Sequence, residues 1–367
     1  MSFQKLIALF NKLVAGAGRL SELSAEAEWD RLHSIEAFRA LLERMRARAD
    51  RTGGEFSLVE FSTRHVQTDD ASLMYLVRTL KGHLRLSDEA GRLDRHSLGV
   101  VLPSASAEDA WNLADRVGLH YPLDLPLPEC KVYRYPTDWL SNKSAQAGEA
   151  KRPASEKKPV HAMEPLFARR TPTWKRCLDV TAAAAGLIAL TPLFALVALS
   201  IKITAPGPVF FRQWRTGRGG RKFQLIKFRS MVVDAESQKQ ALMDRNEQDG
   251  PAFKIKHDPR ITPLGRFLRA TSIDELPQLW NVLVGDMSLV GPRPLPCHEA
   301  AACSRWQRRR LDVVPGLTCT WQVAGRSSVS FAEWMRMDLR YVHSRSLQKD
   351  LKLLLRTVPA VVFGTGS

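Results

Sequence analysis

The chain has 367 residues, 44% of them hydrophobic, which is enough for about two domains with cores of their own. Its formal charge of +16 at pH 7 favours polyanionic partners: nucleic acid, an anionic membrane or phosphorylated ligands. Five scattered cysteines without a Cys-x-x-Cys spacing indicate neither a zinc site nor a disulfide framework, and they fit a reducing, cytosol-facing location. Basic residues interrupt the apolar N-terminal stretch (Lys5, Lys12 and Arg19), so it is a poor signal peptide.

Helical patterns come first along the chain, over residues 1–50. Residues 51–140 then alternate between patterns typical of strands and of helices. A strand is expected at Phe56–Phe61, helices at 71–84 and 108–117, and a hairpin at 88–102. This order of α and β elements resembles a GGDEF domain, which is nucleotide-cyclase-like. The first part of 141–170 is rich in Ser, Ala, Lys and Glu and predicts a flexible linker.

The signature residues of a GGDEF domain are missing from their place. Gly53-Gly54-Glu55-Phe56 has similar letters but precedes the first strand, whereas the hairpin position reads Arg92-Leu-Asp-Arg-His-Ser-Leu98. The resemblance therefore implies a degenerate domain that does not hold metal and triphosphate in the usual way. We expect no cyclase activity there and a regulatory or dimerising role, which would allow a homodimer.

A stretch of 22 residues, Val180 to Ile201, contains no charge. Its length fits a bilayer-spanning helix, because about 20 apolar residues cross a core of roughly 30 Å. Pro192, preceded by Thr191, lies near its middle and would break the helix into two short arms. Basic residues flank both ends, which favours both ends on the cytoplasmic side. The residues leave open a spanning helix and a re-entrant helix-break-helix, and they disfavour a buried core helix.

No acidic residue lies between Asp179 and Asp234, while eight lysines and arginines do. Such a run beside a membrane segment suits anionic headgroups, the alternative being a solvated basic loop. Within it, residues 215–231 predict a β-hairpin that turns at Gly219-Gly220.

Two adjacent carboxylates, Asp274 and Glu275, follow three arginines spaced along one segment: Arg260, Arg266 and Arg269. Carboxylates in that setting can ligate a cation or attack an electrophile, and arginines can hold phosphates beside them. Arg266 and Arg269 would share one helical face. The structural alternative is a capping box from Ser272 to Glu275, with Pro277 favouring a helix start nearby. Capping and catalysis are compatible, since a helix N-terminus attracts phosphate.

Two further motifs follow. In Val290-Gly-Pro-Arg-Pro-Leu-Pro296, two prolines would rigidify a loop that presents Arg293. The other is Val314-Pro-Gly-Leu-Thr-Cys-Thr-Trp-Gln-Val-Ala-Gly-Arg326. With the stretch 266–294, these motifs resemble the bacterial sugar transferases, the monotopic polyprenyl-phosphate phosphoglycosyl transferases. The resemblance covers residues 171–367. In place of the family's usual glycine this chain has Cys319, which leaves its sugar preference open.

The resemblance implies transfer of a sugar 1-phosphate from a UDP-sugar to polyprenyl (undecaprenyl) phosphate, with release of UMP. It implies Asp274 as nucleophile and metal ligand, Glu275 in metal or proton handling, and Mg2+ as cofactor. Phosphate or nucleotide contacts are expected from residues spread over the whole region: Lys227, Arg229, Arg260, Arg266, Arg269, Arg293, Gln322 and Arg326. A re-entrant helix 178–203, broken at Thr191-Pro192, would hold the enzyme on the cytoplasmic face of the inner membrane. Such enzymes initiate exopolysaccharide, O-antigen or other glycoconjugate synthesis, and no nucleic acid is expected as partner.

The tail matches the family's closing pattern at Asp338, Tyr341, Ser346 and Asp350. Apolar residues from Leu347 to Val358 recur at helical spacing, which leaves open a core-packing helix and an interfacial one. The fold class expected is an α/β N-terminal domain, 51–140, and a mainly α, membrane-associated catalytic domain, 171–367, with a re-entrant helix and a small β-hairpin. The alternative function is a membrane-tethered basic protein that binds a cyclic dinucleotide or nucleic acid without transferase activity. It leaves the acid pair and the Pro-Arg-Pro loop unexplained.

Overall fold

The computed structural model describes residues 32–63, 70–122, 125–137, 158–255, 257–324 and 329–362. Among these, two compact units meet in sequence between Met163 and Glu164. The helices predicted within residues 1–31 and most of the predicted linker lie outside the described residues. One part of the expected linker range, 141–170, is ordered into secondary structure, because Val160–Ala162 form strand β5 and Glu164–Phe167 form a 3-10 turn, η1.

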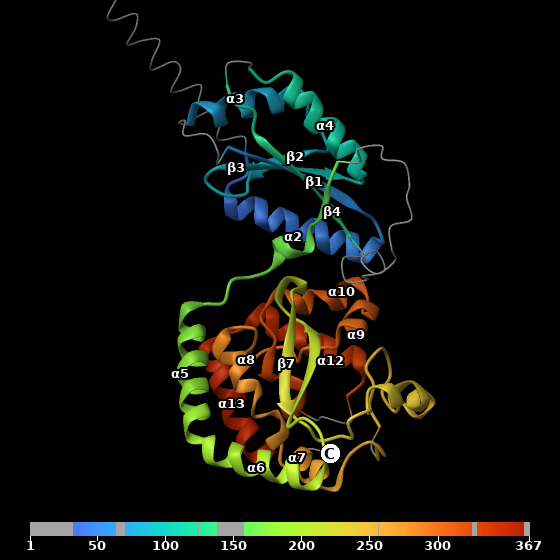
Figure 1. Ribbon diagram of the computed structural model, residues 1–367. Helices are drawn as coiled ribbons and strands as arrows, with labels where there is room; N and C mark the ends of the chain where they lie inside the picture. Colours follow the sequence, from blue (N-terminus) through green and yellow to red (C-terminus); the bar gives the residue numbers. More distant parts are fainter. Residues whose placement is uncertain are drawn as a thin grey trace, which may run out of the picture. The chain divides into compact units, whose positions relative to one another are not determined.

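The first unit is a mixed α/β fold, as the sequence predicted. Its elements are α2 (Ile35–Thr52), β1 (Phe56–Ser62), α3 (Asp70–Lys81), β2 (Glu89–Arg92), β3 (Ser97–Pro103), α4 (Ala107–Leu119), β4 (Glu129–Tyr135) and β5. The strands form one sheet in the order β2-β3-β1-β4-β5, antiparallel except for the β4–β5 pair. Helices α3 and α4 cover one face and α2 covers the other (Figure 1).

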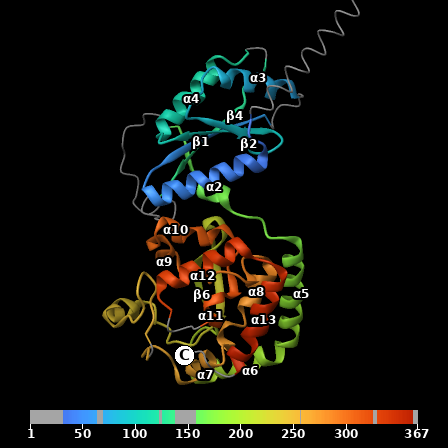
Figure 2. The same ribbon diagram turned by 180° about the vertical axis from the view of Figure 1, so that it is seen from behind.

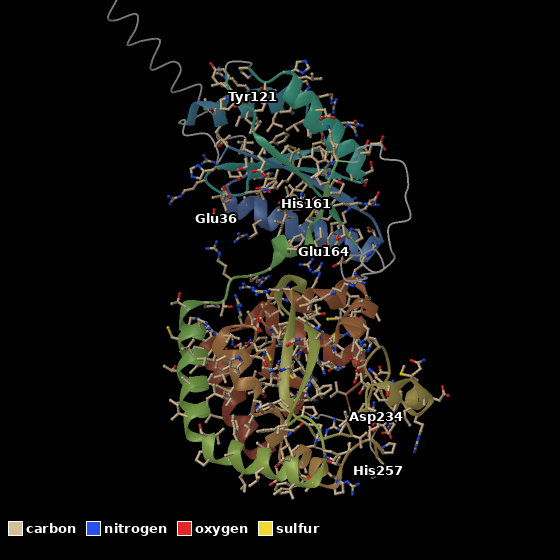
Figure 3. All side chains as sticks on the ribbon, in the orientation of Figure 1. Glu36, Tyr121, His161, Glu164, Asp234 and His257 are labelled. Carbon is tan, nitrogen blue, oxygen red and sulfur yellow. The ribbon has the colours of Figure 1, made fainter. Side chains whose placement is uncertain are left out.

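Local sequence explains the ends of these helices. Ser106 and Asp109 form a reciprocal capping box at the start of α4, and Gly53, with φ of 76°, ends α2. Gly53 thus serves as a helix end before β1, away from the β2–β3 hairpin. Tyr121, labelled in Figure 3, closes the α3–α4 layer by donating from Oη to the Ser72 carbonyl at 3.0 Å.

The second unit begins with two helices, α5 (Thr173–Ala189) and α6 (Thr191–Thr204), followed by the hairpin β6 (Phe210–Thr216) and β7 (Lys222–Phe228) with the turn η2 (Arg218–Gly220). After the hairpin come η3 (Ser237–Arg245), α7 (Pro263–Ala270), η4 (Ile273–Glu275), α8 (Gln278–Val284), β8 (Ser288–Val290), α9 (Cys297–Ala302), α10 (Arg305–Arg308), η5 (Arg309–Asp312), β9 (Gly316–Thr318), α11 (Thr320–Ala324), α12 (Phe331–Ser344) and α13 (Leu347–Val362). The predicted hairpin is present, but its first strand begins at Phe210, five residues before the expected range.

Helices α5 and α6 meet at an angle of 60°, and neither is long and apolar enough to cross a bilayer by itself, although the bent pair meets that test of length and composition. In Figures 1 and 2, α5 runs along the edge of this unit and α6 lies across one end. Leu190 joins the two helices, Pro192 lies in the first turn of α6, and Thr191 Oγ1 donates to the Leu187 carbonyl. Large apolar side chains are exposed on both helices, Ile188 at 77% and Ile203 at 75%, so the pair is not a buried core element.

Helix α8 connects the hairpin to the helical layer. Asn281 accepts from the Ile226 amide at 3.1 Å and donates to the Gln224 carbonyl at 2.7 Å, which fixes β7 against α8. Apolar residues from α5, β7, α8 and β8 form the core beneath, with Ala183, Leu225, Val282 and Val290 among its buried members. The strand that carries Lys227 is therefore held in place by a rigid support.

The tail helix α13 packs one face against the core and leaves another face exposed. Leu353 and Leu354 pack against the core, whereas Leu347, Leu351 and Leu355 are exposed. A buried cluster anchors this helix: Lys175 Nζ pairs with Asp350, and the Tyr341 hydroxyl donates to the same carboxylate at 2.8 Å. Helices α5, α12 and α13 are thus joined by one ion pair and its hydrogen bonds.

Candidate active site

The acid pair lies in η4, a short 3-10 turn between α7 and α8. The capping box predicted at Ser272 is wrong: this residue has φ of 56°, and its side chain makes no capping hydrogen bond. A left-handed backbone at Ser272 turns the chain sharply after α7 and points the Glu275 carboxylate at another partner. The expectation of a helix start near Pro277 is confirmed, because Pro277 is the N-cap of α8.

That partner of Glu275 is Arg293. The guanidinium binds the carboxylate through both terminal nitrogens, with 3.2 Å between Nη1 and Oε2 and a shorter contact between Nη2 and Oε1. A bidentate pair of this kind fixes orientation as well as charge. Burial alone would raise the pKa of Glu275, but Arg293 outweighs it and brings the pKa down to about 2. Glu275 is therefore ionised throughout the neutral range.

The loop that carries Arg293 is fixed by backbone contacts. Gly291 and Gly316 pack against each other so closely that a Cβ on Gly316 would lie 2.0 Å from the Gly291 nitrogen. The amide of Gly291 donates to the Thr318 carbonyl, and that of Gly316 donates to the Pro292 carbonyl. The two motifs, which residues 297–313 separate in the sequence, thus form one rigid structure, and only glycine fits at its centre.

Asp274 is 4% exposed and has no hydrogen bond or ion pair within the part of the chain that the structure describes. Its pKa is raised to about 6, first by burial and then by the neighbouring Glu275 charge; Lys227, Arg269 and Arg293 oppose this rise. A carboxylate that is ionised at neutral pH but held by no direct partner is suited to bind a cation or attack an electrophile.

Lys227 brings positive charge to the acid pair from β7. Burial lowers its pKa to about 8, against the opposing effect of Asp274. Arg269, on α7, is half-buried and acts on both Asp274 and Lys227. Asp274, Glu275, Lys227, Arg269 and Arg293 are therefore brought together from separate segments.

Arg215, on β6, belongs to the same cluster although the sequence marked it only as part of a basic run. Its Nη1 donates to the Pro294 carbonyl at 2.9 Å and its Nη2 to Gln213 Oε1 at 2.6 Å. Burial, reinforced by Arg293, lowers its pKa to about 10, and it contributes to the low pKa of Glu275. Alternation along β6 was the available signal, because residues 211, 213 and 215 share one face of the strand.

Other candidates have different surroundings. Arg229 is buried and donates to the carbonyls of Ala205 and Pro206, both at 2.8 Å, while Arg260 forms a two-pronged pair with Asp258. Both guanidinium groups are thus occupied by the protein itself. Arg266 points to solvent from α7. Gln322 accepts a hydrogen bond from the thiol of Cys319, and Arg326 lies outside the described residues.

A cavity of about 190 Å³ adjoins the cluster. Lys227 and Arg215 form its wall toward the acid pair, and aromatic rings contribute much of the rest: Phe210, Phe211, Phe228 and Phe253. Further lining comes from Arg260 and from the segment that leads into η3, near Asp234, which is labelled in Figure 3. A ligand with a flat ring and a phosphate would match this mixture of aromatic and cationic groups.

Within the described residues, no three His, Cys, Asp or Glu side chains converge as a complete metal site. The acid pair nevertheless suits a magnesium ion, which commonly binds through one or two carboxylates together with waters and substrate phosphates. Asp274 has free acceptor atoms for this purpose, whereas Glu275 already uses both oxygens on Arg293.

A sequence profile described as "Bacterial sugar transferase" matches residues 170–364, more than half of the chain. The chain belongs to the bacterial sugar transferase family. By that membership it is a transferase enzyme. Galactosyl transferase CpsE of Streptococcus agalactiae is 45% identical over 194 residues, which are 53% of this chain and 43% of CpsE. ExoY, an exopolysaccharide production protein of Sinorhizobium fredii, is 40% identical over 197 residues, 53% of this chain and 87% of ExoY.

A third relative is the UDP-glucose:undecaprenyl-phosphate glucose-1-phosphate transferase of Caulobacter vibrioides, 45% identical over 51% of this transferase chain and 69% of its own length. The chain thus spans less than half of the length of CpsE and most of the length of ExoY. Among solved structures, a DGC protein from Thermotoga maritima is similar over 30% of this chain and 86% of its own, at 21% identity and a TM-score of 0.26. At this level the similarity carries no conclusion about activity.

Proposed function

We propose that this transferase moves a sugar 1-phosphate from a UDP-sugar to polyprenyl phosphate, with release of UMP. The proposal rests on the different environments of the two adjacent acids. Glu275 is held by Arg293, while Asp274 beside it is buried, ionised at neutral pH and free of direct partners in the described chain. Names of relatives such as the Caulobacter enzyme support the same substrates.

In the first step, a carboxylate oxygen of Asp274 attacks the β-phosphorus of the UDP-sugar. The bond from this phosphorus to the bridging oxygen breaks, and UMP leaves with the electron pair. The product is a phosphosugar-aspartyl intermediate. Lys227 and Arg269 are placed to offset the charge that accumulates when an anionic carboxylate approaches a diphosphate.

In the second step, an oxygen of the lipid phosphate attacks the same phosphorus and the Asp274 carboxylate departs. This forms the lipid diphosphosugar and restores the enzyme. Mg2+ held by Asp274 and the phosphate oxygens would supply further charge neutralisation. Arg293 keeps Glu275 ionised and oriented, which adds negative charge for the cation.

We further propose that the bent pair α5–α6 enters and leaves the bilayer on the cytoplasmic side. The 60° bend and the exposed apolar residues Ile188, Leu199 and Ile203 support this placement. Nucleotide sugars are cytosolic, so a donor could then reach Asp274 while the lipid phosphate approaches from the headgroup layer. The aromatic and cationic cavity beside Lys227 would receive the nucleotide end of the donor.

A UMP-release assay across several UDP-sugars, with polyprenyl phosphate in detergent micelles, tests the proposal. Continued release beyond a single turnover, requiring both the lipid phosphate and Mg2+, is expected with at least one sugar. Absence of UMP release with every donor, from protein that is folded and membrane-bound, would refute it. The sugar giving the highest kcat/KM identifies the donor, which Cys319 leaves open.

A further inference from the structure

A buried ion pair lies behind the loop that carries Arg293. Arg310, in η5, and Asp338, in α12, have side chains only 3% and 1% exposed. Arg310 Nε donates to Asp338 Oδ2 at 2.9 Å, and Arg310 Nη2 lies 2.7 Å from the same oxygen. The guanidinium also lies over the Trp334 ring, with 5.5 Å from Cζ to the ring centroid. Its orientation is therefore fixed from two sides.

The same guanidinium reaches the active site through the main chain. Arg310 Nη2 also donates to the carbonyl oxygen of Arg293, the residue whose side chain grips Glu275. On the adjacent peptide, Arg215 donates to the carbonyl oxygen of Pro294. Arg215 and Arg310, from different elements, thus bind consecutive carbonyls of one loop. The same loop carries Arg293, whose guanidinium pairs with Glu275.

We propose that the Arg310–Asp338 pair is a positioning device, which sets the orientation of Arg293 and through it the charge state and geometry of the acid pair. The inference rests on the proposed transferase function, since its effect on catalysis is exerted through Glu275 and Asp274. Neither residue touches the reacting atoms. Asp338 holds Arg310, Arg310 fixes the Arg293 carbonyl, and Arg293 orients Glu275.

A purely structural role for the pair makes a different prediction. Breaking a buried pair by removing one partner destabilises a protein, whereas replacing both partners with apolar residues of similar size is often neutral or stabilising. If the pair only stabilised the fold, the apolar replacement would restore both stability and turnover. If it positions Arg293, stability returns but the Arg293 carbonyl still lacks its donor and turnover remains low.

The test therefore uses the double variant Arg310→Met/Asp338→Leu in the full chain, with Arg310→Met alone for comparison. We expect the double variant to unfold within a few degrees of the parent protein, and to release UMP about ten-fold more slowly, with a smaller change in KM for the donor. In an Arg293→Ala background, the same pair of changes should alter the rate less than about two-fold, because effects that act through one residue are not additive. Equal losses in both backgrounds, or full activity of the double variant, would overturn the inference.

Amide hydrogen exchange provides a readout that does not depend on activity. The three amides of this loop, at Gly291, Arg293 and Leu295, should exchange faster in the double variant than in the parent, while the Asn281 region of α8 keeps its protection. Unchanged exchange in the loop would exclude positioning even if no donor supported turnover, so the two proposals can fail separately. Glu333→Gln, which removes the ion pairs to Arg336 and Arg340 on the same helix, α12, is the matched control and should change neither rate nor exchange.

Discussion

Arg293 grips Glu275 through both terminal nitrogens and leaves the adjacent Asp274 carboxylate without a direct partner in the described chain. Two neighbouring acids thereby receive opposite environments. The pKa of Glu275 falls to about 2 because of Arg293, whereas burial and the Glu275 charge raise that of Asp274 to about 6. This division supports the proposal that Asp274 attacks the donor and that Glu275 supplies a fixed negative charge.

Asp274→Asn should abolish UMP release, by at least about 10³-fold, because an amide is a poor nucleophile and a poor metal ligand. The fold should persist. Since the pKa of Asp274 is raised on folding, its ionised form destabilises the native state above about pH 6, so the neutral amide should leave Tm at pH 7.5 equal or higher. Asp244→Asn, at an exposed carboxylate of η3, is the control with unchanged turnover. Near-normal rates in Asp274→Asn would show that another group attacks.

The pH dependence of kcat/KM should be bell-shaped, with an acid limb near pH 6 and an alkaline limb near pH 8. Asp274 must lose its proton to attack, and Lys227 must keep its proton to offset the diphosphate charge. Lys227→Arg should shift the alkaline limb of the profile to above about pH 10, because arginine stays protonated. Lys222→Arg, at an exposed position of the same strand, should leave both limbs in place. If the alkaline limb stays in place in Lys227→Arg, a different group causes it.

Arg229 and Arg266 were both expected to contact substrate phosphate, but their surroundings predict other effects. Substitution of Arg229 should lower stability, and substitution of Arg266 should change neither stability nor activity. Arg229→Lys should lower the free energy of unfolding by about 1–3 kcal/mol, because the buried carbonyls of Ala205 and Pro206 lose donors. Arg266→Ala, at an exposed position, should change neither Tm nor kcat/KM appreciably. Thermal unfolding and UMP release measured together separate the two. A large loss of kcat/KM in Arg266→Ala would show that Arg266 does contact the substrate.

Lys175→Met should destabilise the second unit by about 3–5 kcal/mol, because it leaves the Asp350 carboxylate buried without its cation. Lys175→Met/Asp350→Leu should recover most of this loss, as both charges are then removed. Denaturant unfolding of the full chain measures the free energies. A single variant as stable as the parent would contradict this expectation.

Arg170→Cys and Arg212→Cys, made separately after the five native cysteines are replaced by serine, should both be labelled from the cytoplasmic side of the membrane. Both positions are exposed, and they lie before α5 and after α6. Labelling from opposite sides would establish a spanning segment instead of a re-entrant one. Pro192→Ala should favour a continuous helix and mixed labelling, because it restores a backbone donor and removes the ring clash.

The sequence by itself determined the elements whose signals are local. Periodicity gave β1, α3, the β2–β3 hairpin, α4 and the hairpin at Gly219-Gly220, and a single proline marked the place where α5 and α6 separate. Linked motifs gave the family, since residues 170–364 match its profile. Strand β5 was missed because it has only three residues, and β4 because only Val132 and Tyr135 of its seven residues are buried, which leaves a weak apolar pattern.

Only the tertiary structure decided which charges act together. Arginines look alike in a sequence, yet Arg293 faces an acid, Arg229 faces carbonyls, Arg260 faces Asp258 and Arg266 faces solvent. The capping box at Ser272 failed for the same reason: a long-range bidentate pair outcompetes a local cap for one carboxylate. Desolvation and charge pairing depend on residues distant in the chain, so the separate environments of Asp274 and Glu275 arise only when the fold brings Lys227, Arg269 and Arg293 around them.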